Sequence, residues 1–277
     1  MSTRKRVLFI SQEVTPFIPK GKIAVNVKNL AQQTQEKGKE IRVFTPRYGV
    51  INKRRNELHE VLRLSGMNMV VNDVDHPLLI KVASIRGAKM QVYFIDNEEY
   101  FKRKATVADA KGKLFEDNEE RSMFFIRGTL ETVKKLGWIP DVIHCHGWMS
   151  SLTPLYLRSY FKEDPHFENT KVVTSIYNDD FDGEFGRDIE KKLNFDGIDS
   201  SLFPHLVEKS DFVNLSKTAI DFSDGVIIND EEINSDLASY IDSKDVETLN
   251  YVNGDEYYDQ CYSFYDTVIE KDSILVE

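Results

Sequence analysis

The segment DVIHCHGWMS, at residues 141–150, constrains the fold more than any other part of the sequence. Its first half is an aliphatic run of the kind that forms a buried strand in a parallel α/β sheet. Ligands bind such sheets outside the carboxyl ends of the strands, where polar side chains gather. We therefore expect a central strand at 141–145, with His146, Gly147 and Trp148 at the ligand-binding edge of the sheet.

Two further aliphatic runs, at 6–11 and 171–177, should flank this strand. Each is followed by a polar loop and then by apolar residues at helical spacing, which indicates repeated βαβ units. Right-handed crossovers fold such units into one parallel sheet. The fold class expected is α/β: a single Rossmann-like parallel sheet over residues 1–250, with helices on both faces.

Two other regions depart from this repeat. Residues 58–95 contain three strand-like runs separated by turn-forming residues, which predicts an inserted hairpin region with strands in meander order. The last segment, 251–277, is acidic and aromatic, and Tyr258, Cys261 and Tyr265 fall at helical spacing. We expect a C-terminal helix that packs on the domain and buries these three side chains.

The net charge of −10 lies mainly in one segment of the chain. Residues 221–277 hold 16 acidic and 2 basic side chains, which should repel nucleic acid and other polyphosphates. No apolar run is long enough for a signal peptide or a membrane span, so we expect a cytoplasmic protein without a membrane partner. Cys145 and Cys261 are too few for a disulfide framework and are expected to be reduced.

The central segment also resembles a known family. PDVIHCHGWMSSLTPLYLR, at 140–158, is similar to the Pro-Asp-Val-Val-His-Cys-His-Asp-Trp-His segment of bacterial glycogen and plant starch synthases, which are GT-B glycosyltransferases using ADP-glucose. Gly147 replaces the family's Asp, and Met149 replaces its later His. A second segment carries the family's Tyr-Phe-x-Arg and Asp-Asn-x-Glu-Arg motifs as Tyr100, Phe101, Arg103, Asp117, Asn118, Glu120 and Arg121.

This resemblance, which runs from about residue 6 to about 240, implies a set of substrate-binding residues. Tyr177 stands where the family has a histidine, and His146 is the candidate remnant of the catalytic machinery. Asn118 and Arg121 can equally be capping groups that tether a loop. The candidate substrate-binding residues are His146, Trp148, Tyr177, Asn178, Asn118 and Arg121.

The family's donor loop, Lys-Thr-Gly-Gly-Leu-Ala-Asp-Val, survives here only as the remnant Lys20, Gly21 and Lys22. Pro19 and Val25 stand at the family's lysine and aspartate. Glycines at a helix N-terminus let backbone amides approach a nucleotide, and a lysine at the second glycine adds a side chain there. We therefore expect that ADP-glucose is not held in the family manner.

No cofactor or metal is expected. His144 and His146 alternate along the strand and share one face, but no third ligand accompanies them. His144 lies one step inside the strand, so we expect a core histidine that bonds to backbone. Cys145 carries no signal of a nucleophile beyond its neighbouring histidines.

The resemblance implies glucosyl transfer from ADP-glucose to α-1,4-glucan, the reaction of glycogen biosynthesis. It covers the N-terminal catalytic domain only, because the family's second Rossmann-like domain has no counterpart in this sequence. We therefore expect little activity from the chain alone, a weak affinity for α-glucan, and a protein partner that supplies a donor domain. The alternative is a non-catalytic glucan-binding or regulatory scaffold protein derived from such an enzyme.

Overall fold

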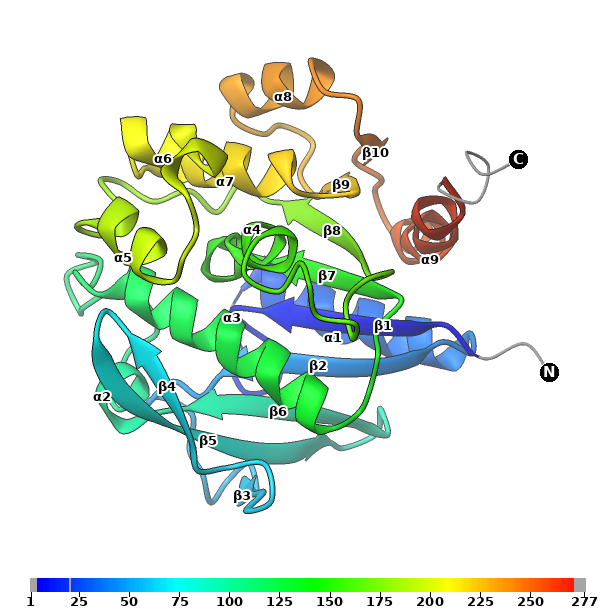
Figure 1. Cartoon of the computed structure of the whole chain (residues 1–277). Coiled ribbons are helices and arrows are strands. Elements are labelled where there is room, and N and C mark those ends of the chain that lie inside the picture. The colour runs from blue at the N-terminus through cyan, green and yellow to red at the C-terminus, as the bar shows by residue number, and fades with distance from the viewer. Residues whose placement is uncertain (1–3, 20, 272–277) are drawn as a thin grey trace.

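A computed structural model describes residues 4–19 and 21–271, and these fold around one large sheet (Figure 1). The strand order is β10-β9-β8-β7-β1-β2-β6-β5-β3, and β4 pairs with β5. The strands are β1 (Arg6–Ser11), β2 (Glu40–Pro46), β3 (His59–Glu60), β4 (Met67–Val71), β5 (Val74–Ile85), β6 (Met90–Asp96), β7 (Val142–His146), β8 (Lys171–Ile176), β9 (Gly225–Ile228) and β10 (Glu247–Leu249).

The predicted central strand is confirmed. β7 lies between β1 and β8 and runs parallel to both, so that His146 is level with Ser11 on one side and Ser175 on the other. All five side chains of β7 are buried, as expected for a parallel strand covered on both faces. Asp141, just before the strand, accepts a hydrogen bond of 2.7 Å from the backbone N–H of Arg6.

The inserted region is present and has the predicted meander order. The long strand β5 pairs antiparallel with β4 before it and with β6 after it, and the two-residue β3 also pairs with β5. A 12-residue strand is long enough to serve several partners along its length. The sheet is therefore parallel from β10 to β6 and antiparallel at its other edge.

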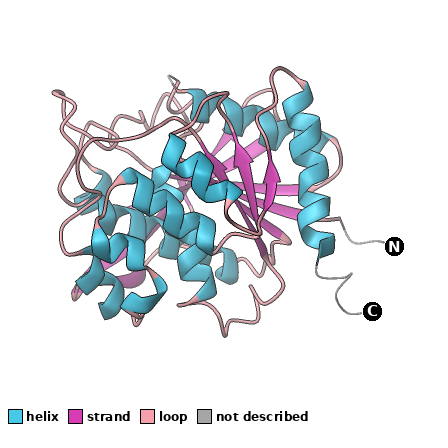
Figure 2. Cartoon of the chain, turned by 90° about the horizontal axis from the view of Figure 1, so that it is seen from above, coloured by secondary structure: helices cyan, strands magenta, loops and turns pink. Residues whose placement is uncertain are grey.

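Helices cover both faces of the sheet, as expected. Figure 1 shows α3 and α4 in front of the sheet and α1 behind it, and Figure 2 shows the helices on either side of the strands from above. The helices are α1 (Lys22–Glu36), α2 (Glu98–Phe101), α3 (Asn118–Lys135), η1 (Trp148–Ser150), α4 (Thr153–Arg158), α5 (Ile189–Phe195), η2 (Ser200–Leu202), α6 (Pro204–Glu208), α7 (Phe212–Asp221), α8 (Ser235–Asp242) and α9 (Glu256–Glu270).

The C-terminal helix is the predicted one, with one correction. α9 follows β10 and packs against α1, and it buries Cys261 and Tyr265 as expected. Tyr258 is only half-buried, whereas its neighbour Tyr257 is buried, because the apolar stripe of α9 passes one position earlier. Lys39 of the domain pairs with Asp266 of α9 at 2.8 Å. None of the helices within residues 4–19 and 21–271 is long and apolar enough to cross a membrane.

Candidate functional site

The edge where β1, β7, β8 and β9 end carries the residues expected to bind a ligand. Gly147 makes the turn after β7 with a positive φ of 78°, a conformation that favours glycine. The side chain of Gln12, which follows β1, lies against Gly147 where a Cβ would stand. Gln12 also accepts a hydrogen bond of 3.3 Å from the backbone N–H of Met149. The glycine therefore allows two adjacent strand ends to pack together.

The two histidines of β7 share one face, as predicted, with ring centroids 3.8 Å apart. His144 bonds to the hydroxyls of Tyr265 and Ser175, each at 2.8 Å, rather than to backbone as expected. Nδ1 of His146 lies 2.9 Å from the hydroxyl of Tyr177. Both histidines are fully buried.

Burial sets the charge state of these histidines. It disfavours the imidazolium form, so the pKa of His146 is lowered to about 3 and that of His144 is lowered well below its ordinary value. Both rings are neutral at pH 7. A group with so low a pKa accepts a proton poorly, which limits His146 as a general base in this conformation.

The other residues expected at the ligand-binding edge of the sheet differ in exposure. Trp148 is buried against Phe181 and Phe185, with ring centroids 5.0 and 5.7 Å away. Tyr177 is buried beneath the edge. Asn178 is exposed, and its backbone N–H donates a hydrogen bond of 2.8 Å to Asp230. The structure thus brings His146 and Tyr177 together in the interior and leaves Asn178 facing solvent.

The donor-loop remnant lies at the N-terminus of α1. Its Gly21 and Lys22 contact residues from other segments of the chain. Lys20 falls outside the described residues. Gly21 lies against the carboxylate of Glu13, which would collide with a Cβ at this position. The ammonium of Lys22 forms an ion pair with Asp230 and donates a hydrogen bond of 2.6 Å to the carbonyl of Asn229. The positive charge of Lys22 is therefore largely neutralised within the protein.

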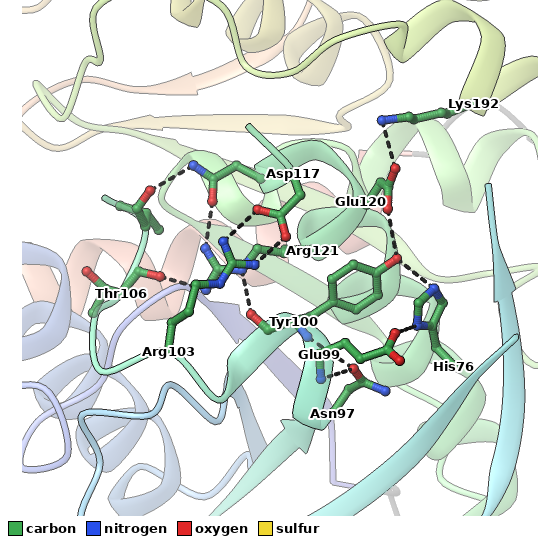
Figure 3. A network of polar contacts seen from close by, with 12 residues as sticks. His76, Asn97, Glu99, Tyr100, Arg103, Thr106, Asp117, Glu120, Arg121 and Lys192 are labelled. Atoms are coloured by element: carbon green, nitrogen blue, oxygen red, sulfur yellow. Dashed lines mark hydrogen bonds and ion pairs between the residues drawn. The ribbon is translucent and has the colours of Figure 1, made fainter. Parts of the chain in front are cut away.

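Arg121 and Asn118 have a structural role (Figure 3). Arg121 is fully buried and donates to the carbonyls of Tyr100 and Thr106, at 2.9 and 2.6 Å, and to Oδ1 of Asn118 at 2.6 Å. Asn118 in turn donates to the carbonyl of Val107 at 2.8 Å. Of the two roles left open by the sequence, loop tethering accounts for every polar contact of these side chains.

Asn118 is the first residue of α3 and not its N-cap, so it does not have the capping role that the sequence allowed. Asp117 stands at the N-cap of α3 without a side-chain capping bond, because its carboxylate forms an ion pair with Arg103.

Beside this ion pair, Figure 3 shows a chain of polar side chains that joins four elements. The Tyr100 hydroxyl lies 2.9 Å from Nε2 of His76 and donates to Glu120 at 3.0 Å, and Glu120 pairs with Lys192 at 2.8 Å. This chain fixes α2, α3 and α5 relative to β5.

Sequence reasoning missed several polar residues at the sheet edge. The Asn26 side chain, one turn into α1, donates toward the hydroxyls of Tyr177 and Tyr257 and toward Asn229 at 3.1–3.2 Å. Asp179 follows β8, and its Oδ2 is shielded from solvent without a hydrogen-bond partner in the described part of the chain. The sequence did carry a signal for Asp179, because polar residues that follow parallel strands meet at one edge of the sheet.

Glu13 and Asp179 are two carboxyls whose ionisation is opposed by burial. Desolvation raises the pKa of Glu13 from 4.5 to about 7 and that of Asp179 from 3.8 to about 7, and the nearby Glu13 carboxylate also raises the pKa of Asp179. This edge of the sheet therefore changes charge close to neutral pH.

Replacing Glu13 with glutamine should change how stability depends on pH. The folded protein binds the Glu13 proton more tightly than the unfolded chain does, so wild-type stability from this group falls as pH rises from 4.5 through about 7. The advantage of Glu13→Gln over wild type should therefore grow across this window and level off above it. Urea titrations at several pH values measure the difference, with the exposed Glu98→Gln as control. A difference that does not vary with pH would contradict the assignment.

Within the described ranges, no three His, Cys, Asp or Glu side chains come together in an arrangement that could hold a metal ion.

Comparison with known proteins assigns the chain to a family. Residues 6–249 match the sequence profile of the starch synthase catalytic domain. The chain is 34% identical over 235 residues to the glycogen synthase of Chlorobaculum parvum, covering 84% of this chain and 47% of that protein. It is 36% identical over 220 residues to the glycogen synthase of Chlorobium limicola, covering 79% of this chain and 44% of that protein.

The catalytic domain of starch synthase IV from Arabidopsis thaliana, solved bound to ADP and acarbose, has a similar fold. The TM-score is 0.74 at 19% identity, and the match covers 91% of this chain and 52% of that one. The mostly parallel sheet with its helical layers is thus a GT-B glycosyltransferase fold. More specifically, the chain belongs to the starch synthase catalytic domain family. It spans about half the length of the curated glycogen synthases that it matches.

Proposed function

We propose that this protein takes part in α-glucan metabolism as the acceptor-side half of a glycogen synthase. In this proposal it binds α-1,4-glucan weakly at the carboxyl edge of the sheet and, as a 277-residue chain, transfers little or no glucose from ADP-glucose. The family match over 6–249 supports the glucan as ligand. The unpaired, buried Cys145 and Cys261 suit the reducing cytoplasm, which we propose as its location.

The proposed loss of activity is supported by the contacts that other residues make with the donor-loop remnant. A nucleotide diphosphate at the N-terminus of α1 requires exposed amides and an available cation. Here Glu13 lies against Gly21, and Lys22 is paired with Asp230. An incoming diphosphate would meet the carboxylates of Asp230 and of Glu13, whose pKa is about 7, and would have to displace Lys22 from its ion pair.

The glucan would bind where side chains still reach solvent. Asn178 is exposed and can hydrogen-bond a sugar, while the buried His146, Trp148 and Tyr177 hold the backbone of the edge in place. Few contacts on an open face should give a dissociation constant of roughly 1 mM, about −4 kcal/mol.

A second proposal concerns the donor-binding half that a complete synthase requires. GT-B chemistry needs a donor held opposite the acceptor, so another domain or a protein partner must provide that site. Phe195, Leu202 and Val207 are exposed on the adjacent α5, η2 and α6, and such apolar side chains suit a protein contact. The regulatory or scaffold alternative uses the same surface without catalysis.

A transfer assay with ADP-glucose and glycogen tests the proposal, together with co-sedimentation on glycogen. We expect the purified 277-residue chain to co-sediment weakly and to incorporate no glucose above background. Turnover near that of a complete synthase, abolished by His146→Ala, would overturn the claim of lost activity. Absence of co-sedimentation at tens of millimolar glucose equivalents would overturn the claim of glucan binding.

A further inference from the structure

A small pocket of about 260 Å³ lies beside the donor-loop remnant. It is formed by the start of α1, the residue that follows β9, and the segment 251–258, which contains the connection from β10 and the first turn of α9. This segment lies outside the family match, which ends at 249. The pocket is therefore built in part from residues to which the family assignment gives no role.

Three tyrosines and three asparagines are among the residues that line this pocket. Aromatic rings present flat apolar faces, and amides offer both donors and acceptors, so the combination suits a ligand with apolar faces and many hydroxyls. The six residues are Asn26, Asn229, Asn253, Tyr251, Tyr257 and Tyr258.

Some of these polar groups are satisfied within the protein, and others are available to a ligand. The Tyr257 hydroxyl donates to Asn229 at 2.6 Å, and the Asn26 amide nitrogen donates toward both of these groups. Within the ranges that the structure describes, the Tyr251 hydroxyl and the Asn253 amide have no side-chain hydrogen bond, and Asn253 is exposed. One wall of the pocket is thus a fixed network, and the other has free hydrogen-bonding groups.

The charge of the pocket disfavours anions. Lys22 is its only cation among the described lining residues, and that ammonium is paired with Asp230 while lying 5.8 Å from the ring centroid of Tyr251. Asp255 adds a carboxylate to the rim. A phosphate would meet net negative charge, whereas a neutral polyhydroxylated ligand would find carboxylate and amide acceptors for its hydroxyls.

We propose that this pocket binds one neutral hexose unit, whose ring stacks on Tyr251 and whose hydroxyls bond to Asn253 and Asp255. The volume lies just below the roughly 300–1,000 Å³ of sites for larger small molecules, which suits a single sugar ring. That the hexose is the end of an α-glucan rests on the proposed function. Asp230 contacts both Lys22 of the pocket and Asn178, so a glucan could continue from the pocket along the sheet edge.

Calorimetric titration of the intact chain with maltotriose, and separately with galactose, tests this site. Tyr251→Ala should weaken maltotriose binding about tenfold or more, because the stacking surface is removed, and Tyr251→Phe should retain most of the affinity. The control is Phe195→Ala, which truncates another exposed aromatic side chain and should leave binding unchanged. Circular dichroism and thermal melting verify that each variant folds.

The outcomes separate this inference from the proposed function. If Asn178→Ala weakens maltotriose binding and Tyr251→Ala does not, the pocket is wrong and the glucan function stands. If only galactose binds, and Tyr251→Ala abolishes that binding, the pocket is right and the glucan function is wrong. If wild type binds neither sugar up to tens of millimolar, the hexose site is overturned.

Discussion

Replacing Arg121 with alanine is expected to lower the free energy of unfolding by about 3–5 kcal/mol. The variant would leave three buried acceptors without a donor, each lost bond costing about 1–3 kcal/mol, and would open a cavity between α3 and the loop after α2. Burial lowers the pKa of Arg121 to about 10, so the guanidinium is charged at pH 7 and all its donors are present. Urea-induced unfolding measures the change.

The matched control for Arg121 is Arg187→Ala. The Arg187 side chain is 75% exposed and lies 3.4 Å from Glu116 at the surface, so its removal should change stability by no more than about 0.5 kcal/mol. Equal effects of the two substitutions would show that the tether around Arg121 is not the structural element described above. Arg121→Lys should fall between them, because lysine keeps the charge but cannot reach all three acceptors.

Ending the chain at residue 252 should abolish cooperative folding. α9 buries five side chains on the domain, which contribute on average about 1.5–3 kcal/mol each. Their sum, about 8–15 kcal/mol, equals the whole stability of a typical domain. The five side chains are Tyr257, Cys261, Phe264, Tyr265 and Val268.

The control for this truncation is Tyr265→Phe. It keeps the aromatic ring and removes only the hydroxyl that bonds to His144, so we expect a folded protein that is destabilised by about 1–2 kcal/mol. Circular dichroism melting curves compare the two proteins. A truncated chain that melts at the wild-type temperature would show that α9 is a dispensable appendage rather than part of the core.

Hydrophobic patterns predicted the parallel part of the fold well. The runs that became β1, β7 and β8 are continuous and aliphatic, because each strand is covered on both faces, and such runs have few alternative structures. The antiparallel edge could be predicted from its turns, because the short turns after β4 and β5 join consecutive strands as hairpins. The pairing of the two-residue β3 with β5 has no such local signal.

The candidate site could be located from the sequence, but the exposure of its residues could not. His146, Trp148 and Tyr177 do lie at the ends of β7 and β8, as polar and aromatic residues after buried strands predict. Trp148 is covered by Phe181 and Phe185 from the loop after β8, and the hydroxyl of Tyr177 bonds to Asn26 of α1. Packing between segments so far apart has no periodic signal in a single sequence.

The ion pair between Lys22 and Asp230 shows the same limit. The sequence marks Lys22 as an unusual residue in a glycine loop, where its side chain is expected to stand in the way of a nucleotide. Asp230 lies 208 residues later in the chain and meets Lys22 because β9 ends beside the N-terminus of α1. Only the fold brings these two charges together, and their pairing changes what the loop can bind.

Amide chemical-shift mapping on the isotopically labelled 277-residue chain tests the central claim most directly. Maltoheptaose should shift the amides around Asn178, Asp230 and 251–255 with a dissociation constant of roughly 1 mM. ADP-glucose at the same concentrations should leave the amides of Gly21 and Lys22 unchanged. Saturable shifts of Gly21 and Lys22 with micromolar ADP-glucose, or maltoheptaose shifts that map away from the carboxyl edge, would contradict the account.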